Sequence, residues 1–138
     1  MLLYAAGFRG GAKRLLERGG AVVYVREDAV LSGAQAVRSF LSSPQALPVY
    51  FFGDLDYSGM EILRNLRHVF PRAQAWQPGY ELLLDLLRAG VGHMADWAGK
   101  EGQVDPGSCG CSWADSVLLT ALRESRRFVD QEAAVWPA

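Results

Sequence analysis

The sequence predicts an α/β domain in which a mostly parallel, Rossmann-like sheet is flanked by helices. Short apolar segments rich in β-branched or aromatic residues alternate along the chain with longer segments that have helical spacing. Of the 138 residues, 50% are hydrophobic and 21% are charged, which is typical of one globular domain. No apolar run approaches the roughly 18 residues that a membrane helix needs. We therefore expect a single cytoplasmic domain over residues 1–138 that does not engage a membrane.

The first 52 residues supply three predicted strands and two helices. The strands cover residues 2–6, 21–25 and 49–52. The second of these reads AVVYV, a continuous β-branched and aromatic run of the kind that buried parallel strands contain. The helices cover residues 10–18 and 32–41, where apolar residues recur at helical spacing.

The remainder predicts one more strand and three helices. Residues 57–70 form the clearest helix, because their apolar residues share one face and Pro71 follows. A short strand is expected at 73–76 and a Leu-rich helix at 79–89. The Gly-rich stretch 90–112 is expected to be an irregular surface loop. A last helix should begin at Ser112 or Trp113 and carry core residues as far as Val129.

Two acids, Asp54 and Asp56, follow the strand at 49–52 at the place where open α/β sheets carry their chemistry. Residues at i and i+2 of an extended segment point to one side, so the two carboxylates can converge. Such a pair suits Mg²⁺, which binds carboxylate oxygens together with water and phosphate. Gly59 would permit a tight turn or the approach of a phosphate to the helix N-terminus. The alternative is that the acids only cap the following helix.

The segment VYFFGDLDYSGMEILRNLRHVFP resembles the second acidic motif of Toprim domains. The similarity is greatest to the branch that contains the topoisomerase VI A subunit, the meiotic break-forming proteins and the C-terminal domain of the Wadjet plasmid-defence protein JetD. It covers about residues 47–90, and the matching positions are Gly53, Asp54, Asp56, Gly59, Ile62 and Leu63. The stretch FVDQE, which includes Gln131 and Glu132, loosely resembles the Leu-Glu-Gln-Glu-like end of that family, with Asp130 in place of the first Glu.

This resemblance implies a Toprim-like fold and Mg²⁺-dependent cleavage of nucleic-acid phosphodiesters. Asp54 and Asp56 would hold the metal, and a Glu after an upstream strand would be the third ligand or the acid/base. Glu27 follows AVVYV and fits locally, but it lies only 27 positions before Asp54, too few for the strand–helix unit that the family carries there. On the other interpretation that Glu would precede Met1, and the domain would be incomplete at its N-terminus.

The charge pattern is compatible with DNA or RNA as a partner. The net charge is −1, yet residues 1–26 carry a balance of +4. Lys13, Arg14, Arg64 and Arg67 are the candidate phosphate contacts, and a solvated helix face is the simpler interpretation of the last two. The resemblance also makes a protein partner subunit or an oligomer plausible, in a plasmid-defence or DNA-break complex.

Two other functions remain open. The stretch from Asp54 to Ser58 comes near the Asp-x-Asp-x-Thr signature of haloacid-dehalogenase-type phosphatases, in which the first Asp is a nucleophile. The sequence shows no evident downstream Lys and Asp-Asp pair of that family. The third possibility is a Toprim-like module that binds DNA or a partner and has no catalytic activity. The near-neutral charge and the spacing of Glu27 favour it.

Overall fold

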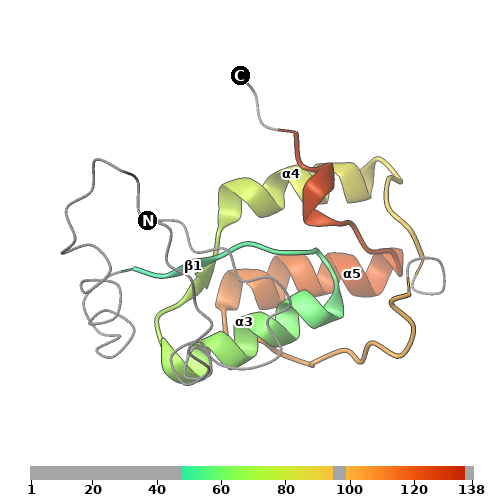
Figure 1. The fold of residues 1–138 in the computed structure, drawn as a ribbon. Helices are drawn as coiled ribbons and strands as arrows, with labels where there is room; N and C mark the ends of the chain where they lie inside the picture. The colour runs from blue at the N-terminus through green and yellow to red at the C-terminus, as the bar shows by residue number, and fades with distance from the viewer. Residues whose placement is uncertain (1–47, 95–98, 136–138) are drawn as a thin grey trace, which may run out of the picture.

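The structure is a computed structural model, and it describes residues 48–94 and 99–135. Within them, β1 (Tyr50–Phe51) and β2 (Gln74–Ala75) form a two-stranded parallel sheet, with Tyr50 paired to Gln74 and Phe51 to Ala75. Helix α3 (Tyr57–Val69) connects the two strands (Figure 1). The described part of the chain therefore has a mixed α/β architecture. The strands and helices predicted between residues 2 and 41 lie outside the described residues.

Helix α3 begins and ends where the sequence predicts, to within one residue. Asp56 caps its N-terminus by accepting a hydrogen bond from the backbone N–H of Gly59. Its C-cap is Phe70, whose N–H donates to the carbonyl oxygen of Leu66. The helix ends here because the next residue is Pro71, and proline cannot continue a helix.

Helix α4 (Gln77–Arg88) starts two residues before the predicted position. Pro78 lies in its first turn, where the fixed φ of proline favours a helix and its missing N–H has no cost. The chain leaves the helix through Ala89 and Gly90, which has φ +77°.

The last helical region differs from the prediction at its end. A π-helical segment, η2 (Ala114–Leu118), leads into α5 (Leu119–Ser125). Arg126 then adopts φ 54°, a left-handed conformation that stops the helix. The prediction that Phe128 and Val129 lie on this helix is wrong: Phe128 forms an antiparallel bridge with His93, and Val129 forms one with Leu55. A short 3-10 turn, η3 (Gln131–Ala133), follows.

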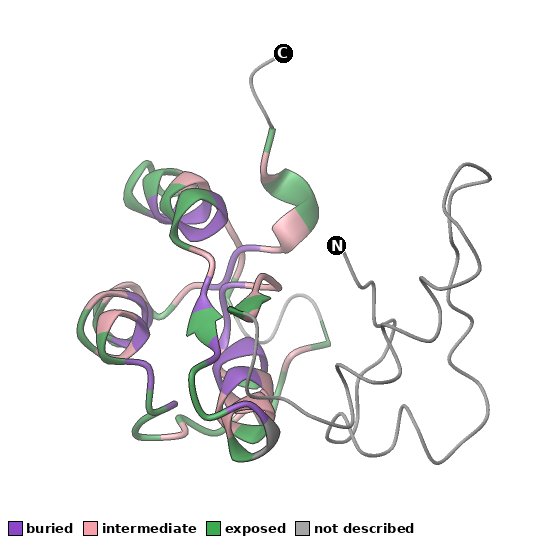
Figure 2. Cartoon of the chain, turned by 90° about the vertical axis from the view of Figure 1, so that its left-hand side faces the viewer, coloured by how far each residue is buried: buried purple, intermediate pink, exposed green. Residues whose placement is uncertain are grey.

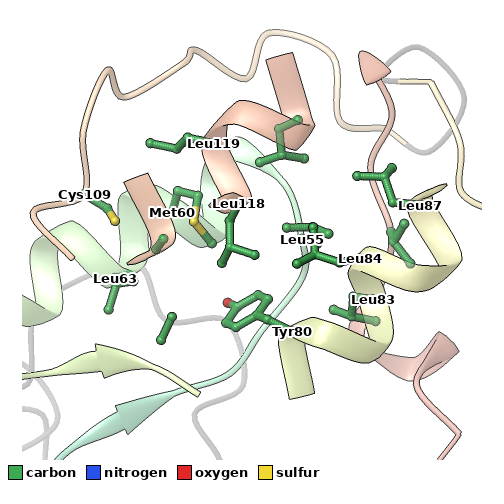
Figure 3. Close-up of a cluster of buried hydrophobic side chains, with 14 of the residues drawn as sticks. Leu55, Met60, Leu63, Tyr80, Leu83, Leu84, Leu87, Cys109, Leu118 and Leu119 are labelled. Carbon is green, nitrogen blue, oxygen red and sulfur yellow. The ribbon is translucent and has the colours of Figure 1, made fainter. Parts of the chain in front are cut away.

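A main core joins these elements (Figure 2), and Phe70 and Ala73 form a second, smaller buried cluster. Figure 3 shows side chains of α4 directed toward side chains of α3, η2 and α5. The largest fully buried hydrophobic side chains are Leu55, Met60, Leu63, Tyr80, Leu83, Leu84, Leu118, Leu119, Leu122 and Val129. Leu55 is therefore a core residue between the two acids of the predicted motif. Of the helices in the described ranges, none combines the length and the apolar character required to cross a membrane.

Candidate functional site

The carboxylates of Asp54, Asp56 and Asp130 meet at the side-chain ammonium of Lys100. The distances from Lys100 Nζ are 2.9 Å to Asp54 Oδ2, 2.8 Å to Asp56 Oδ2 and 2.6 Å to Asp130 Oδ1. Asp54 and Asp56 thus converge on one point, as their spacing predicts. The third acid at this point is Asp130, whereas Glu27 lies outside the described residues. We call these four residues the carboxylate cluster.

The bridge between Leu55 and Val129 explains why the acids share one side. The N–H of Leu55 donates to the carbonyl of Val129 at 2.9 Å, and the N–H of Val129 donates back at 3.2 Å. Both side chains are buried in the core. Because successive residues of an extended chain point to opposite faces, Asp54, Asp56 and Asp130 lie on the face opposite to the Leu55 and Val129 side chains.

Asp56 has two structural roles. Its Oδ1 accepts the 2.6 Å hydrogen bond from Gly59 N that caps α3, so the capping interpretation of this acid is correct. Its Oδ2 contacts Lys100 and also accepts a 3.0 Å hydrogen bond from Gln103 Nε2. The side chain is only 3% exposed. Asp56 is therefore the buried end of the cluster, and capping uses only one of its two oxygens.

Asp54 and Asp130 form the solvent-facing end, with side chains 36% and 44% exposed. Asp54 Oδ1 accepts a 3.0 Å hydrogen bond from the backbone N–H of Gln131. Asp130 Oδ2 lies 3.2 Å from Nε2 of His93. A ligand that enters from solvent would therefore reach these two carboxylates before it reached Asp56.

The cluster carries an excess of negative charge, since three carboxylates and one ammonium sum to −2. Burial alone would lower the pKa of Lys100, but hydrogen bonds to Asp130, Asp56 and Asp54 outweigh it and hold the pKa above its ordinary value. Burial alone would raise the pKa of Asp130, but its hydrogen bond to Lys100 and the nearby positive charge outweigh that effect and lower it. The three acids together therefore hold Lys100 in its charged form.

The three acids supply carboxylate oxygens, and the point on which they converge is taken by Lys100. Carboxylate oxygens are the ligands that Mg²⁺ prefers. Within residues 48–94 and 99–135, no group of three or more His, Cys, Asp or Glu side chains is arranged to hold a metal ion as it stands. A metal at the cluster would therefore require Lys100 to move away.

Glycine is required at position 59 by a close backbone approach. A Cβ added to Gly59 would lie 2.2 Å from the carbonyl oxygen of Asp54. A Cβ added to Gly53 would lie 2.9 Å from the ring of Phe51, which a side-chain movement could relieve. The Gly59 position thus serves the tight turn between the acids and α3, the first of its two predicted roles.

The two arginines predicted to contact nucleic acid are engaged within the protein. Arg64 pairs with Glu61 at 2.7 Å and donates to the carbonyl of Pro106 at 3.1 Å. Arg67 donates to the carbonyl of Ala73. Lys13 and Arg14 lie outside the described residues.

Gln131 and Glu132, which the family resemblance singles out near the end of the chain, differ in whether they contact the cluster. The backbone N–H of Gln131 binds Asp54, whereas the Glu132 side chain is exposed and accepts a 3.3 Å hydrogen bond from Gln131 Nε2. Only the first of them therefore touches the carboxylate cluster.

Sequence reasoning did not identify Lys100, Gln103 or His93 as part of this site. Lys100 and Gln103 lie in the Gly-rich stretch predicted to be a surface loop, where no periodicity indicates what a side chain contacts. The loose FVDQE similarity was the available signal for Asp130. Beside the cluster, an open groove of about 450 Å³ runs between the start of α3 and residues 102–106. Gln103 lines this groove and also donates a hydrogen bond to Asp56 of the cluster.

Comparison with known proteins gave no matching family model, no matching curated protein and no matching solved structure.

Proposed function

We propose that this chain is a Toprim-like domain that cleaves nucleic-acid phosphodiesters with Mg²⁺ held by Asp54, Asp56 and Asp130. The observation that carries the proposal is the convergence of these three carboxylates on one cation, the Lys100 ammonium, at 2.6–2.9 Å. Metal-dependent phosphoryl chemistry needs such a concentration of negative oxygen donors. Asp130 would act in place of the Glu that the family resemblance assigns upstream, or together with Glu27.

Each residue has a distinct role in this proposal. Asp56, fixed by Gly59 and Gln103, would be the rigid ligand, and the more exposed Asp54 and Asp130 would face the substrate. His93 orients Asp130 through its Nε2 contact. When bound, Mg²⁺ would offset charge on the scissile phosphate and activate a water molecule.

The proposed substrate is DNA or RNA, and the basic residues of the first 26 positions, Lys13 and Arg14 among them, would contact its phosphates. Arg64 and Arg67 would have to exchange their intramolecular contacts for phosphate before they could contribute. A partner subunit or a second copy would complete the binding surface, as the family resemblance implies.

Cleavage assays on plasmid DNA, single-stranded DNA and RNA in millimolar Mg²⁺ test this proposal. Wild-type protein should cleave at least one of them, and Asp54→Asn and Asp130→Asn should remove that activity. Asp85→Asn is the matched control, because Asp85 is an exposed acid that pairs only with Arg88 among the contacts described. Equal cleavage by the wild type and both cluster variants would contradict the proposal.

A phosphatase of the haloacid-dehalogenase type is the second candidate. That family needs a downstream Lys and an acid near its nucleophilic Asp, and Lys100 lies 2.9 Å from Asp54 and 2.6 Å from Asp130. Asp54 would then be phosphorylated by the substrate. Retention of a beryllium fluoride-type phosphate analogue by the wild type but not by Asp54→Asn, without nuclease activity, would select this function.

A module without catalytic activity is the third candidate, and Lys100 is again the observation that favours it. An ammonium bound by three carboxylates can serve as a permanent structural ion pair. In that case millimolar Mg²⁺ would not bind, and binding to DNA or a partner protein would be unaffected by Asp54→Asn.

A further inference from the structure

Lys100 approaches the three acids from an irregular segment, here called the strap (residues 99–107). The strap is attached to the rest of the domain by two residues that follow Lys100. Gln103 donates to Asp56 and accepts a 2.9 Å hydrogen bond from the backbone N–H of Ser58. Further along, Asp105 pairs with Arg123 at 2.6 Å. Gln103 and Asp105 thus hold the strap through contacts that do not involve the Lys100 side chain.

We propose that Lys100 is a tethered cation that occupies the divalent-cation site when no metal is bound, and that a metal ion and Lys100 exclude each other. The proposal rests on the divalent site proposed above and assigns its regulation. A divalent ion arriving at the cluster must displace the ammonium.

Geometry requires this exclusion. Lys100 Nζ is within 2.9 Å of an oxygen of each acid, so it lies at the point that those three oxygens surround. A Mg²⁺ ion binding the same oxygens at about 2.1 Å would need this point for itself. The Mg²⁺ ion and the Lys100 ammonium would repel each other strongly at this point, because the lysine side chain is only 15% exposed and water screens the two charges little.

The charge of the cluster explains why the protein would carry such a lysine. Without any cation, three neighbouring carboxylates, one of them almost fully buried, would repel one another and destabilise the fold. Lys100 supplies one positive charge at the end of a long, flexible stem, whereas the strap is held by the separate contacts of Gln103 and Asp105. The metal-free protein therefore remains folded, and the metal has to compete for its ligands.

Lysine accessibility tests this directly, because the sequence contains only two lysines, Lys13 and Lys100. The wild-type chain is acetylated briefly with an amine-specific reagent, and both sites are quantified by mass spectrometry, with Lys13 as the internal reference. Millimolar Mg²⁺ should raise the acetylation of Lys100 relative to Lys13 severalfold, whereas choline chloride at equal ionic strength should not. In Asp54→Asn the ratio should start higher and respond less to Mg²⁺. An unchanged ratio in Mg²⁺ overturns the proposal.

Lys100→Met provides a second measurement. Removal of the competing ammonium should tighten Mg²⁺ binding by about tenfold or more, measured by titration calorimetry, a size typical of coupled sites. It should also make the thermal midpoint depend more strongly on Mg²⁺ than in the wild type, and this can be measured even if the metal-free variant is poorly folded. Lys13→Met is the matched control. Equal or weaker Mg²⁺ binding by Lys100→Met overturns the proposal.

These readouts separate the two proposals. Release of Lys100 by Mg²⁺ with no cleavage of any nucleic acid supports the tethered cation and rejects the nuclease. Cleavage that depends on Mg²⁺ and Asp54 with no change at Lys100 supports the nuclease and rejects the tethered cation.

Discussion

Asp54 accepts a 3.0 Å hydrogen bond from the backbone N–H of Gln131, a residue 77 positions away in the sequence. This bond joins the segment that follows β1 to the first residue of η3. The neighbouring Leu55–Val129 bridge supports the same junction with two more backbone hydrogen bonds. The junction places Asp130 beside the two acids of the motif and thus completes the carboxylate cluster.

Substitution of Asp56 should destabilise the protein more than substitution of Asp54. Asp56→Ala removes the cap of α3 and leaves Gln103 Nε2 without its acceptor, at an expected loss of about 1–2 kcal/mol in the free energy of unfolding. Asp54→Ala removes a half-exposed contact and relieves part of the negative charge. Urea denaturation measures both, and an equal or larger loss for Asp54→Ala would contradict the assigned capping role.

Gly59→Ala should be strongly destabilising. Its Cβ would lie 2.2 Å from a backbone oxygen of Asp54, which cannot rotate away as a side chain would. We expect a loss of about 3 kcal/mol, at the upper end of overpacking effects. Gly90→Ala is the matched control: no atom lies within 4 Å of its added Cβ, and only its positive φ adds a cost, of about 1 kcal/mol. Thermal unfolding of both variants should rank them in this order.

Stability in acid should depend on Asp115. Burial alone would raise the pKa of this carboxyl, but hydrogen bonds from the Cys109 and Gly110 N–H groups and from Ser108 outweigh it, and the pKa is lowered from 3.8. A carboxyl whose pKa is lowered by folding stabilises the protein above its ordinary pKa, and this contribution disappears as the pH falls through the folded-state value.

Asp115→Asn should therefore be less stable than the wild type at neutral pH and approach it as the pH drops below 3.8. Denaturation midpoints measured across this range give the comparison, with the exposed Asp85→Asn as the control. A constant difference in stability between wild type and Asp115→Asn at every pH would show that these hydrogen bonds do not favour the ionised form of Asp115.

Arg126→Gly should stabilise the protein. Arg126 ends α5 with φ 54°, a conformation that costs an L-residue roughly 1 kcal/mol and that glycine adopts freely. We expect a gain of about 1 kcal/mol in the free energy of unfolding. Glu124→Gly, inside the same helix, should instead lose about 1 kcal/mol. If both glycine variants lose stability, the left-handed position of Arg126 carries no strain.

The sequence by itself determined helices α3 and α4 of the described region. The apolar stripe of α3, its end at Pro71 and the Leu-rich face of α4 depend on contacts and periodicities within one element, so residue order specifies them. The convergence of Asp54 and Asp56 is equally local, because alternation along an extended chain places both beside a buried Leu55.

Only the tertiary structure decided which residues join those acids. Lys100 and Asp130 lie 46 and 76 positions beyond Asp54, in segments without periodicity, and no local rule states what they contact. Asp130 was brought in because Arg126 ends α5 early and the chain then pairs with residue 55 instead of continuing as a helix. Local propensity determines where the helices and strands form. Which side chains meet at a site built from such distant residues depends on how those elements pack in the core.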